Sequence, residues 1–156
     1  MMTELKSIKI HTVTFGDMIV PEDKIISFKD GLPGFPHIHK FAIIEQDEWK
    51  PFQHLQALGD LPIALLIVNP FLLHPAYEFQ LSRADMEDIQ SSDSKDVMVF
   101  AVATIPENAE DATLNLMAPI VINGASRLGK QVILHESGYG VRHPLFKTAK
   151  TTAKSE

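Results

Sequence analysis

Alternation between apolar and polar residues dominates this chain. Short segments rich in Val, Ile and Phe place an apolar side chain at every second position, which is typical of β-strands. Turn-forming pairs such as Asp30-Gly31 and Asn69-Pro70 separate several of these segments. The predicted strands are Ser7–Phe15, Ile25–Phe28, Phe41–Glu45, Ile63–Val68, Ala76–Leu81, Val97–Thr104, Ile120–Asn123 and Gln131–His135. Within Ser7–Phe15 the apolar phase switches after Ile10, which predicts a bulge or bend.

Helical signals are few. Ser82 followed by Asp85 resembles a capping box, so a short helix is predicted to begin there and to end in the polar run Gln90–Asp96. A second helical turn is expected around Phe52, Leu55 and Leu58, because the apolar residues there are three positions apart.

The number of short strands predicts a mainly all-β fold, a small antiparallel β-barrel-like or sandwich domain with one or two short helices. Strands do not alternate with helices along the chain, which argues against a Rossmann-type sheet. The 156 residues fit one domain, which we place at residues 1–146. The Lys-rich tail at residues 147–156 has no apolar anchor and is predicted to be disordered.

Composition and charge narrow the function further. The chain has no cysteine, so disulfides, thiolate catalysis and Cys-ligated zinc are excluded. No signal peptide or membrane-spanning run is recognisable, and we therefore expect a cytoplasmic protein. The net charge is −6, and the chain without its last ten residues carries 11 basic and 19 acidic residues, or −8. An acidic protein of this kind repels the phosphate backbone of nucleic acids, so we expect no direct nucleic-acid binding. We expect a basic protein partner instead.

One pattern suggests a metal. His37 and His39 in an H-x-H pattern, with Glu45 on the following strand, resemble the first metal-binding motif of cupin barrels. Glu45, however, is one residue too far along and would face the opposite side of a continuous strand. A small metal-dependent barrel enzyme that uses these three residues is the alternative interpretation. A flavin-binding split barrel is a third, although no phosphate-binding cluster is evident. No nucleophile elbow or phosphate-binding loop is present, and we predict that the protein is not an enzyme and needs no cofactor.

The stretch TLNLMAPIVIN, Thr113 to Asn123, is unusual for a strand. Asn115 lies between two leucines, and Pro119 lacks the N–H that a β-ladder uses. The structural interpretation is that Asn115 bonds neighbouring backbone and that Pro119 begins an edge strand. The functional interpretation is that an edge without a full ladder meets a partner. We favour the structural interpretation.

Three stretches together resemble the FliW family of flagellar assembly factors. The first is Ile26–Phe35, with Gly31-Leu32-Pro33-Gly34-Phe35 at its end; the second is Pro51–Ala57, with the run that ends at Pro70; the third is Thr113–Asn123, followed by Gly129–Leu134 and Tyr139. The resemblance covers the chain from about Ile8 to Arg142. One departure is Ala57, where the family pattern usually has Ser.

The resemblance implies a non-enzymatic regulator with a small antiparallel β-barrel-like fold. FliW-like proteins bind newly made flagellin in the cytoplasm. They also bind CsrA, a basic RNA-binding protein that represses flagellin translation, and antagonise it allosterically. Flagellin and CsrA are therefore the expected partners of this chain. The resemblance also implies roles in flagellum biogenesis, as a chaperone and in translation regulation.

Several residues are candidates for contact with a partner. Trp49 and Phe52 flank Lys50-Pro51 in a polar loop, where they either form a binding hot spot or plug the end of the barrel. Phe71-Leu72-Leu73 could form an apolar patch for flagellin's helices, but we expect it to be buried against the Ser82–Gln90 helix. The predicted partner-binding residues are Trp49, Phe52, Asn115, Leu116, Pro119 and Asn123.

Overall fold

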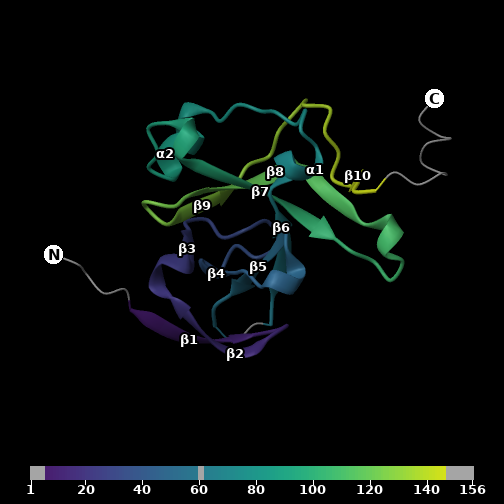
Figure 1. The fold of residues 1–156 in the computed structure, drawn as a ribbon. Helices are drawn as coiled ribbons and strands as arrows, with labels where there is room; N and C mark the ends of the chain where they lie inside the picture. Colours follow the sequence, from purple (N-terminus) through teal and green to yellow (C-terminus); the bar gives the residue numbers. More distant parts are fainter. Residues whose placement is uncertain (1–5, 60–61, 147–156) are drawn as a thin grey trace.

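The computed structural model describes residues 6–59 and 62–146 and is built mainly of strands (Figure 1). The strands are β1 (Ser7–Thr12), β2 (Gly16–Pro21), β3 (Ile25–Phe28), β4 (Lys40–Ile44), β5 (Phe52–Ala57), β6 (Ala64–Val68), β7 (Val97–Thr104), β8 (Thr113–Asn123), β9 (Leu128–Gln131) and β10 (His143–Pro144). The helices are α1 (Pro70–Leu73) and α2 (Arg83–Asp88), and short 3-10 turns are formed by Glu22–Lys24, Asp47–Trp49, Ser94–Asp96 and Ala109–Asp111. None of these helices is long and apolar enough to cross a membrane. The predicted disordered tail lies outside the described residues.

Seven strands close into a barrel. Neighbours from β3 to β8 pair antiparallel in chain order, and β9 joins the two ends by pairing antiparallel with β8 and parallel with β3. β10 adds to the first residues of β8, while β1 and β2 form a separate hairpin. The predicted fold class, a mainly antiparallel barrel with two short helices, is confirmed.

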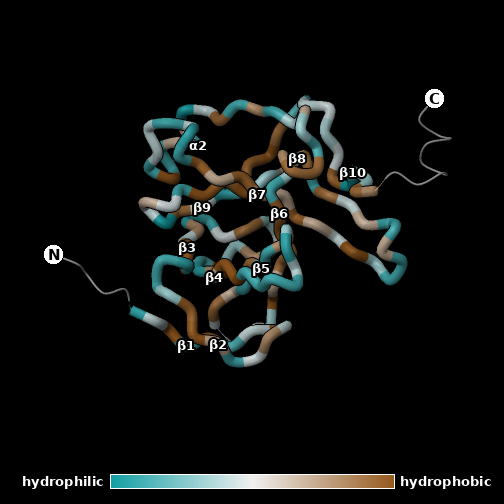
Figure 2. The backbone as a smooth tube through the Cα atoms, in the orientation of Figure 1, coloured by the Kyte–Doolittle hydropathy of each residue, from teal (hydrophilic) through white to brown (hydrophobic). Residues whose placement is uncertain are grey.

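The hydrophobic core has one part inside the barrel and two parts outside it. In Figure 2 the hydrophobic residues lie mostly on the strands and the hydrophilic residues mostly in the connecting loops. The barrel interior is filled by residues such as Phe28, Phe41, Leu55 and Ile120, each fully buried. Outside the barrel, the segments before α2 and after β9 cover β7 and β8 through a cluster of Val68, Tyr77, Ile89, Ala101, Ala103, Leu114, Leu116, Val121, Val132 and Leu134. The β1–β2 hairpin covers the outer side of β4 through Ile10, Val20, Ala42 and Ile44. Burial on both faces explains why so many strands are apolar at consecutive positions.

The phase switch predicted within Ser7–Phe15 is a hairpin turn, not a bend in one strand. The Thr12 hydroxyl donates to the carbonyl of Gly16 (2.7 Å) and accepts from the N–H of Phe15 (2.8 Å). Gly16 has φ of +68°, which glycine adopts without a steric cost. The side chain of Gln56 accepts from the N–H of Val13 (2.9 Å) and thereby holds this turn against β5.

Three further secondary-structure predictions are wrong. The predicted helical turn at Phe52–Leu58 is strand β5; the threefold spacing arose because Phe52 packs outside the barrel and Leu55 inside it. The predicted strand Ala76–Leu81 pairs with no other described strand, although Tyr77, Phe79 and Leu81 all pack on the outer cluster. In the predicted strand Gln131–His135 only Gln131 belongs to β9, because from Val132 onward the chain bonds to the irregular middle of β8.

The predicted helix is confirmed as α2. The Ser82 side chain accepts from the N–H of Asp85 (3.0 Å), as the capping-box pattern indicates. Lys130 of β9 holds this helix through Asp85 Oδ1 (2.7 Å) and Asp88 Oδ2 (2.6 Å).

Candidate protein-binding surface

The backbone geometry of the Gly31–Phe35 stretch and of β9 at Gly129 depends on glycine. Gly31 and Gly34 have φ of +66° and +89°, and a Cβ on Gly31 would lie 2.5 Å from the carbonyl oxygen of Phe35. A Cβ on Gly129 would lie 2.7 Å from the ring of Phe28, so only glycine lets β9 approach β3. These glycines therefore have a structural role.

Asn115 and Pro119 flank a bulge in the middle of β8. Phe100 of β7 pairs with Ile120, but Val102 pairs with Asn115, so four residues of β8 face a single residue of β7. Asn115 Oδ1 accepts from the N–H groups of Met117 (3.2 Å) and Ala118 (3.1 Å), which confirms its predicted backbone-bonding role. The prediction that Pro119 begins an edge strand is wrong: it lies inside β8, where the interrupted ladder needs no N–H.

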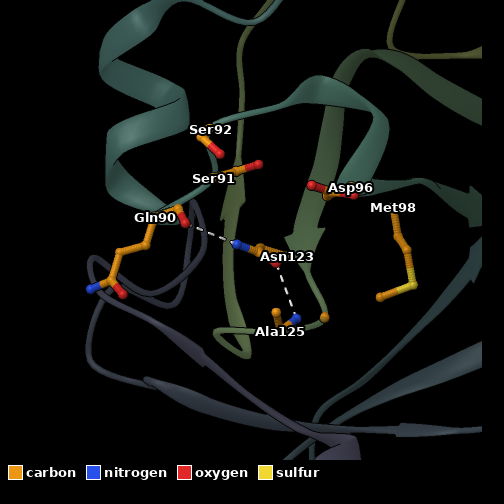
Figure 3. Close-up of a pocket in the computed structure, with 8 residues that line it drawn as sticks. Gln90, Ser91, Ser92, Asp96, Met98, Asn123 and Ala125 are labelled. Atoms are coloured by element: carbon orange, nitrogen blue, oxygen red, sulfur yellow. Dashed lines mark hydrogen bonds between the residues drawn. The ribbon is translucent and has the colours of Figure 1, made fainter.

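The predicted contact residues Leu116, Pro119 and Asn123 are buried, with exposed fractions of 0% for Leu116 and 5% for Asn123. Asn123 Nδ2 donates to the carbonyl of Ile89 (3.0 Å). It also donates to the carbonyl of Gln90 (3.1 Å), and its Oδ1 accepts from the N–H of Ala125 (3.0 Å), as Figure 3 shows. These side chains are used internally and are not displayed to a partner in this structure.

Trp49 lies partly exposed on the outer side of the barrel. Its ring contacts His54 edge-to-face at 4.9 Å between centroids, and the Phe15 ring also contacts His54 edge-to-face, at 5.0 Å. His54 is 7% exposed, its Nδ1 has no hydrogen-bond partner among the described residues, and burial lowers its pKa. Trp49 thus covers a buried imidazole with one part of its ring and leaves 36% of its surface open. Phe52 is half-buried against the outer cluster.

The short helix α1 presents exposed apolar side chains. Asn69 caps this helix by accepting from the N–H of Phe71 (2.9 Å), and Pro70 occupies its first position, where no N–H is needed. The predicted burial of Phe71–Leu73 against α2 is wrong, since Phe71, Leu72 and Leu73 are 39%, 62% and 37% exposed. The sequence signal for α1 is Asn69-Pro70, a cap followed by a helix-starting proline, a pair that is also typical of a turn.

Next to α1, the first half of β7 has an open edge, which the prediction from sequence missed. β6 ends at Val68, opposite Ala101, and the chain turns away into α1. Val97–Phe100 therefore pair with β8 on one side and with no strand of the described chain on the other. A hollow of about 640 Å³ lies along this edge, bordered by Glu45, Lys50 and Pro51, by α1, and by Val97–Phe100.

The surroundings of this edge are acidic. Glu45, Asp93 and Asp96 line the hollows around it, and none of these carboxylates forms an ion pair with a side chain in the part of the chain that the structure describes. The two loops that border the edge are residues 45–51 and 93–96. Apart from Glu48, their charged residues are Glu45, Asp47, Lys50, Asp93, Lys95 and Asp96, four acidic and two basic, which gives a net charge of −2.

The alternative metal site receives no support. The His39 Nδ1 lies 3.0 Å from the carbonyl oxygen of Phe28, and His37 is exposed. Within residues 6–59 and 62–146, no three His, Asp or Glu side chains gather in a way that could hold a metal ion, so His37, His39 and Glu45 are not brought together.

Comparison with known proteins agrees with this fold. Residues 9–145 match the family model described as FliW protein. The chain is 38% identical over 136 residues to a protein named flagellar assembly factor FliW from Bacillus subtilis (strain 168), covering 87% of this chain and 95% of that one. The protein of the same name from Bacillus licheniformis is 40% identical over 136 residues, with the same coverage. A crystal structure of the flagellar assembly factor FliW superposes with a TM-score of 0.85 at 37% identity, covering 91% of this chain and 99% of that one. The chain belongs to the FliW family of flagellar assembly factors.

Proposed function

We propose that this protein acts in the cytoplasm as a non-enzymatic regulator that binds newly made flagellin and the RNA-binding regulator CsrA. In this proposal, export of flagellin frees the protein, which then binds CsrA and relieves the repression of flagellin translation. Family membership supports a role in flagellar assembly. The two partners extend that role to a specific mechanism.

The observation that carries the proposal is the exposed apolar surface of α1 beside the acidic edge of β7. Leu72 is 62% exposed on a capped, ordered helix, and an apolar side chain held in this way is suited to contact an apolar segment of flagellin. CsrA binds RNA and is basic, so the net charge of −6 would attract it from a distance. Trp49, Phe52 and Asn115 remain candidate contact residues.

A genetic experiment tests this function. Deleting the gene for this protein should lower the amount of flagellin, because CsrA is then no longer antagonised. Deleting the CsrA gene as well should restore flagellin. An unchanged flagellin level in the single deletion, or no restoration in the double deletion, would contradict the proposed mechanism.

A further inference from the structure

The open edge of β7 has the geometry of a strand acceptor. Val97–Phe100 are fixed in extended conformation by their pairing with Ile120–Asn123 of β8. On the other side no described strand pairs with them beyond the Val68–Ala101 pair. An unpaired edge of this kind forms main-chain hydrogen bonds with an added strand. A helix could not do so, because its backbone groups are already bonded.

Both faces of the edge have room for side chains. Val97 and Val99 line a hollow of about 720 Å³ on the outer face together with Phe71, Phe79, Leu81 and Met86. Met98 lines a hollow of about 470 Å³ that Figure 3 shows, and is 42% exposed. Side chains of an added strand alternate between the two faces. Apolar residues at alternate positions would therefore meet the valine side, with the intervening residues facing the hollow beside Asp96.

Charge selects among possible occupants. Glu45, Asp93 and Asp96 border the edge and form no ion pair within the described chain. A second copy of this protein, paired edge to edge, would bring the same carboxylates together, and like charges that face each other are destabilising. A basic segment would instead provide the missing cations.

We propose that Val97–Phe100 of β7 bind an extended segment of a basic partner protein as an added strand, with its apolar side chains packed on the α1 side of the edge. The inference rests on the proposed function, because it assumes that the protein binds a basic regulator of the CsrA kind. It adds the position and the mode of binding.

The test uses the full-length protein and purified CsrA of the same organism. Met98→Lys places a cation at the open edge of β7, where Met98 is exposed, without disturbing the buried core. This variant should weaken CsrA binding at least tenfold. Ile133→Lys is the matched control, because Ile133 is 40% exposed but lines none of the hollows along this edge; it should bind within about twofold of wild type. Melting curves should show both variants folded.

Hydrogen exchange provides an independent measurement that does not depend on any variant. Amide exchange in the peptide containing Val97–Phe100 should slow when CsrA is bound, because an added strand bonds this edge. Wild-type binding with unchanged exchange in this peptide would overturn the inference and leave the proposed function intact, as would a Met98→Lys variant that binds like wild type. Failure of the wild-type protein to bind CsrA at all would overturn both.

Discussion

The Tyr77 hydroxyl donates a hydrogen bond to the carbonyl oxygen of Leu116 across 2.7 Å, joining the chain before α2 to the bulge of β8. Both residues are buried, and burial raises the pKa of the Tyr77 phenol, so the hydroxyl stays protonated and remains a donor at neutral pH. The bulge is thus held from outside by the segment that was wrongly predicted to be a strand.

Tyr77→Phe should lower the free energy of unfolding by about 1–2 kcal/mol, because it removes the donor to a buried carbonyl. Urea unfolding followed by circular dichroism measures this difference. Tyr139→Phe is the matched control: the Tyr139 hydroxyl accepts from the more exposed N–H of Glu78 at 3.1 Å, so a smaller loss is expected. Equal effects of the two variants would contradict this assignment.

Gly129→Ala should destabilise the protein by roughly 1–3 kcal/mol, because the new methyl group would overlap the ring of Phe28 in the packed barrel. Gly124→Ala serves as the control, since its Cβ would meet only the Met98 side chain at an ordinary 3.5 Å. Thermal unfolding of both variants makes the comparison. A Gly129→Ala protein as stable as wild type would show that β3 and β9 are not in close contact.

Lys130→Met removes the cation shared by Asp85 and Asp88. Burial raises the pKa of Asp85, but hydrogen bonds from Lys130 and Ser82 outweigh it and lower the pKa overall; the hydrogen bond from Lys130 lowers that of Asp88. A lowered folded-state pKa stabilises the fold above the ordinary value of 3.8, and this contribution is lost as the pH falls through the folded-state value. The variant should be less stable by roughly 1–2 kcal/mol at pH 7, between the values for exposed and buried pairs.

The difference between wild type and Lys130→Met should shrink as the pH falls toward 2 and the two carboxylates take up protons. Lys50→Met, which removes an exposed pair with Asp47, should have a much smaller effect at pH 7. A wild-type advantage that stays constant from pH 7 to pH 2 would show that the Lys130 cluster is not the cause.

His54→Phe should make the protein less sensitive to acid. Burial lowers the pKa of His54, so below the ordinary value of 6.5 the unfolded state binds more protons than the folded state. The free energy of unfolding of the wild type therefore decreases as the pH is lowered below this value. Phenylalanine keeps the edge-to-face contacts with Phe15 and Trp49 but does not titrate. Urea unfolding at pH 8 and pH 5 should show a smaller loss for the variant. Identical losses would contradict the prediction.

Much of the fold could be predicted because local signals agree with tertiary structure in several elements. Val97–Thr104 is predicted and found as a strand, and Ser82 caps α2 as its sequence indicates. The Ala76–Leu81 pattern misled because its alternating aromatic residues pack outside the barrel without a pairing partner. In this case burial, not hydrogen bonding, produced the period of two.

The candidate surface could not be predicted in the same way. The open edge exists because β6 ends opposite Ala101 while β7 begins four residues earlier, and the pairing register of two distant strands sets this offset. The residues that carried the family resemblance, such as Gly129 and Asn115, close the barrel or hold the bulge. They identify the fold, whereas the exposed residues of α1 and β7 are ordinary apolar residues whose accessibility depends on tertiary structure.

Calorimetric titration of purified CsrA and of monomeric flagellin into this protein tests the central claim most directly. We predict saturable binding of each partner with a Kd of about 1 µM or tighter, which corresponds to roughly −8 kcal/mol or more. Absence of binding by both partners at tens of micromolar would contradict the proposal that this member of the FliW family acts by capturing them.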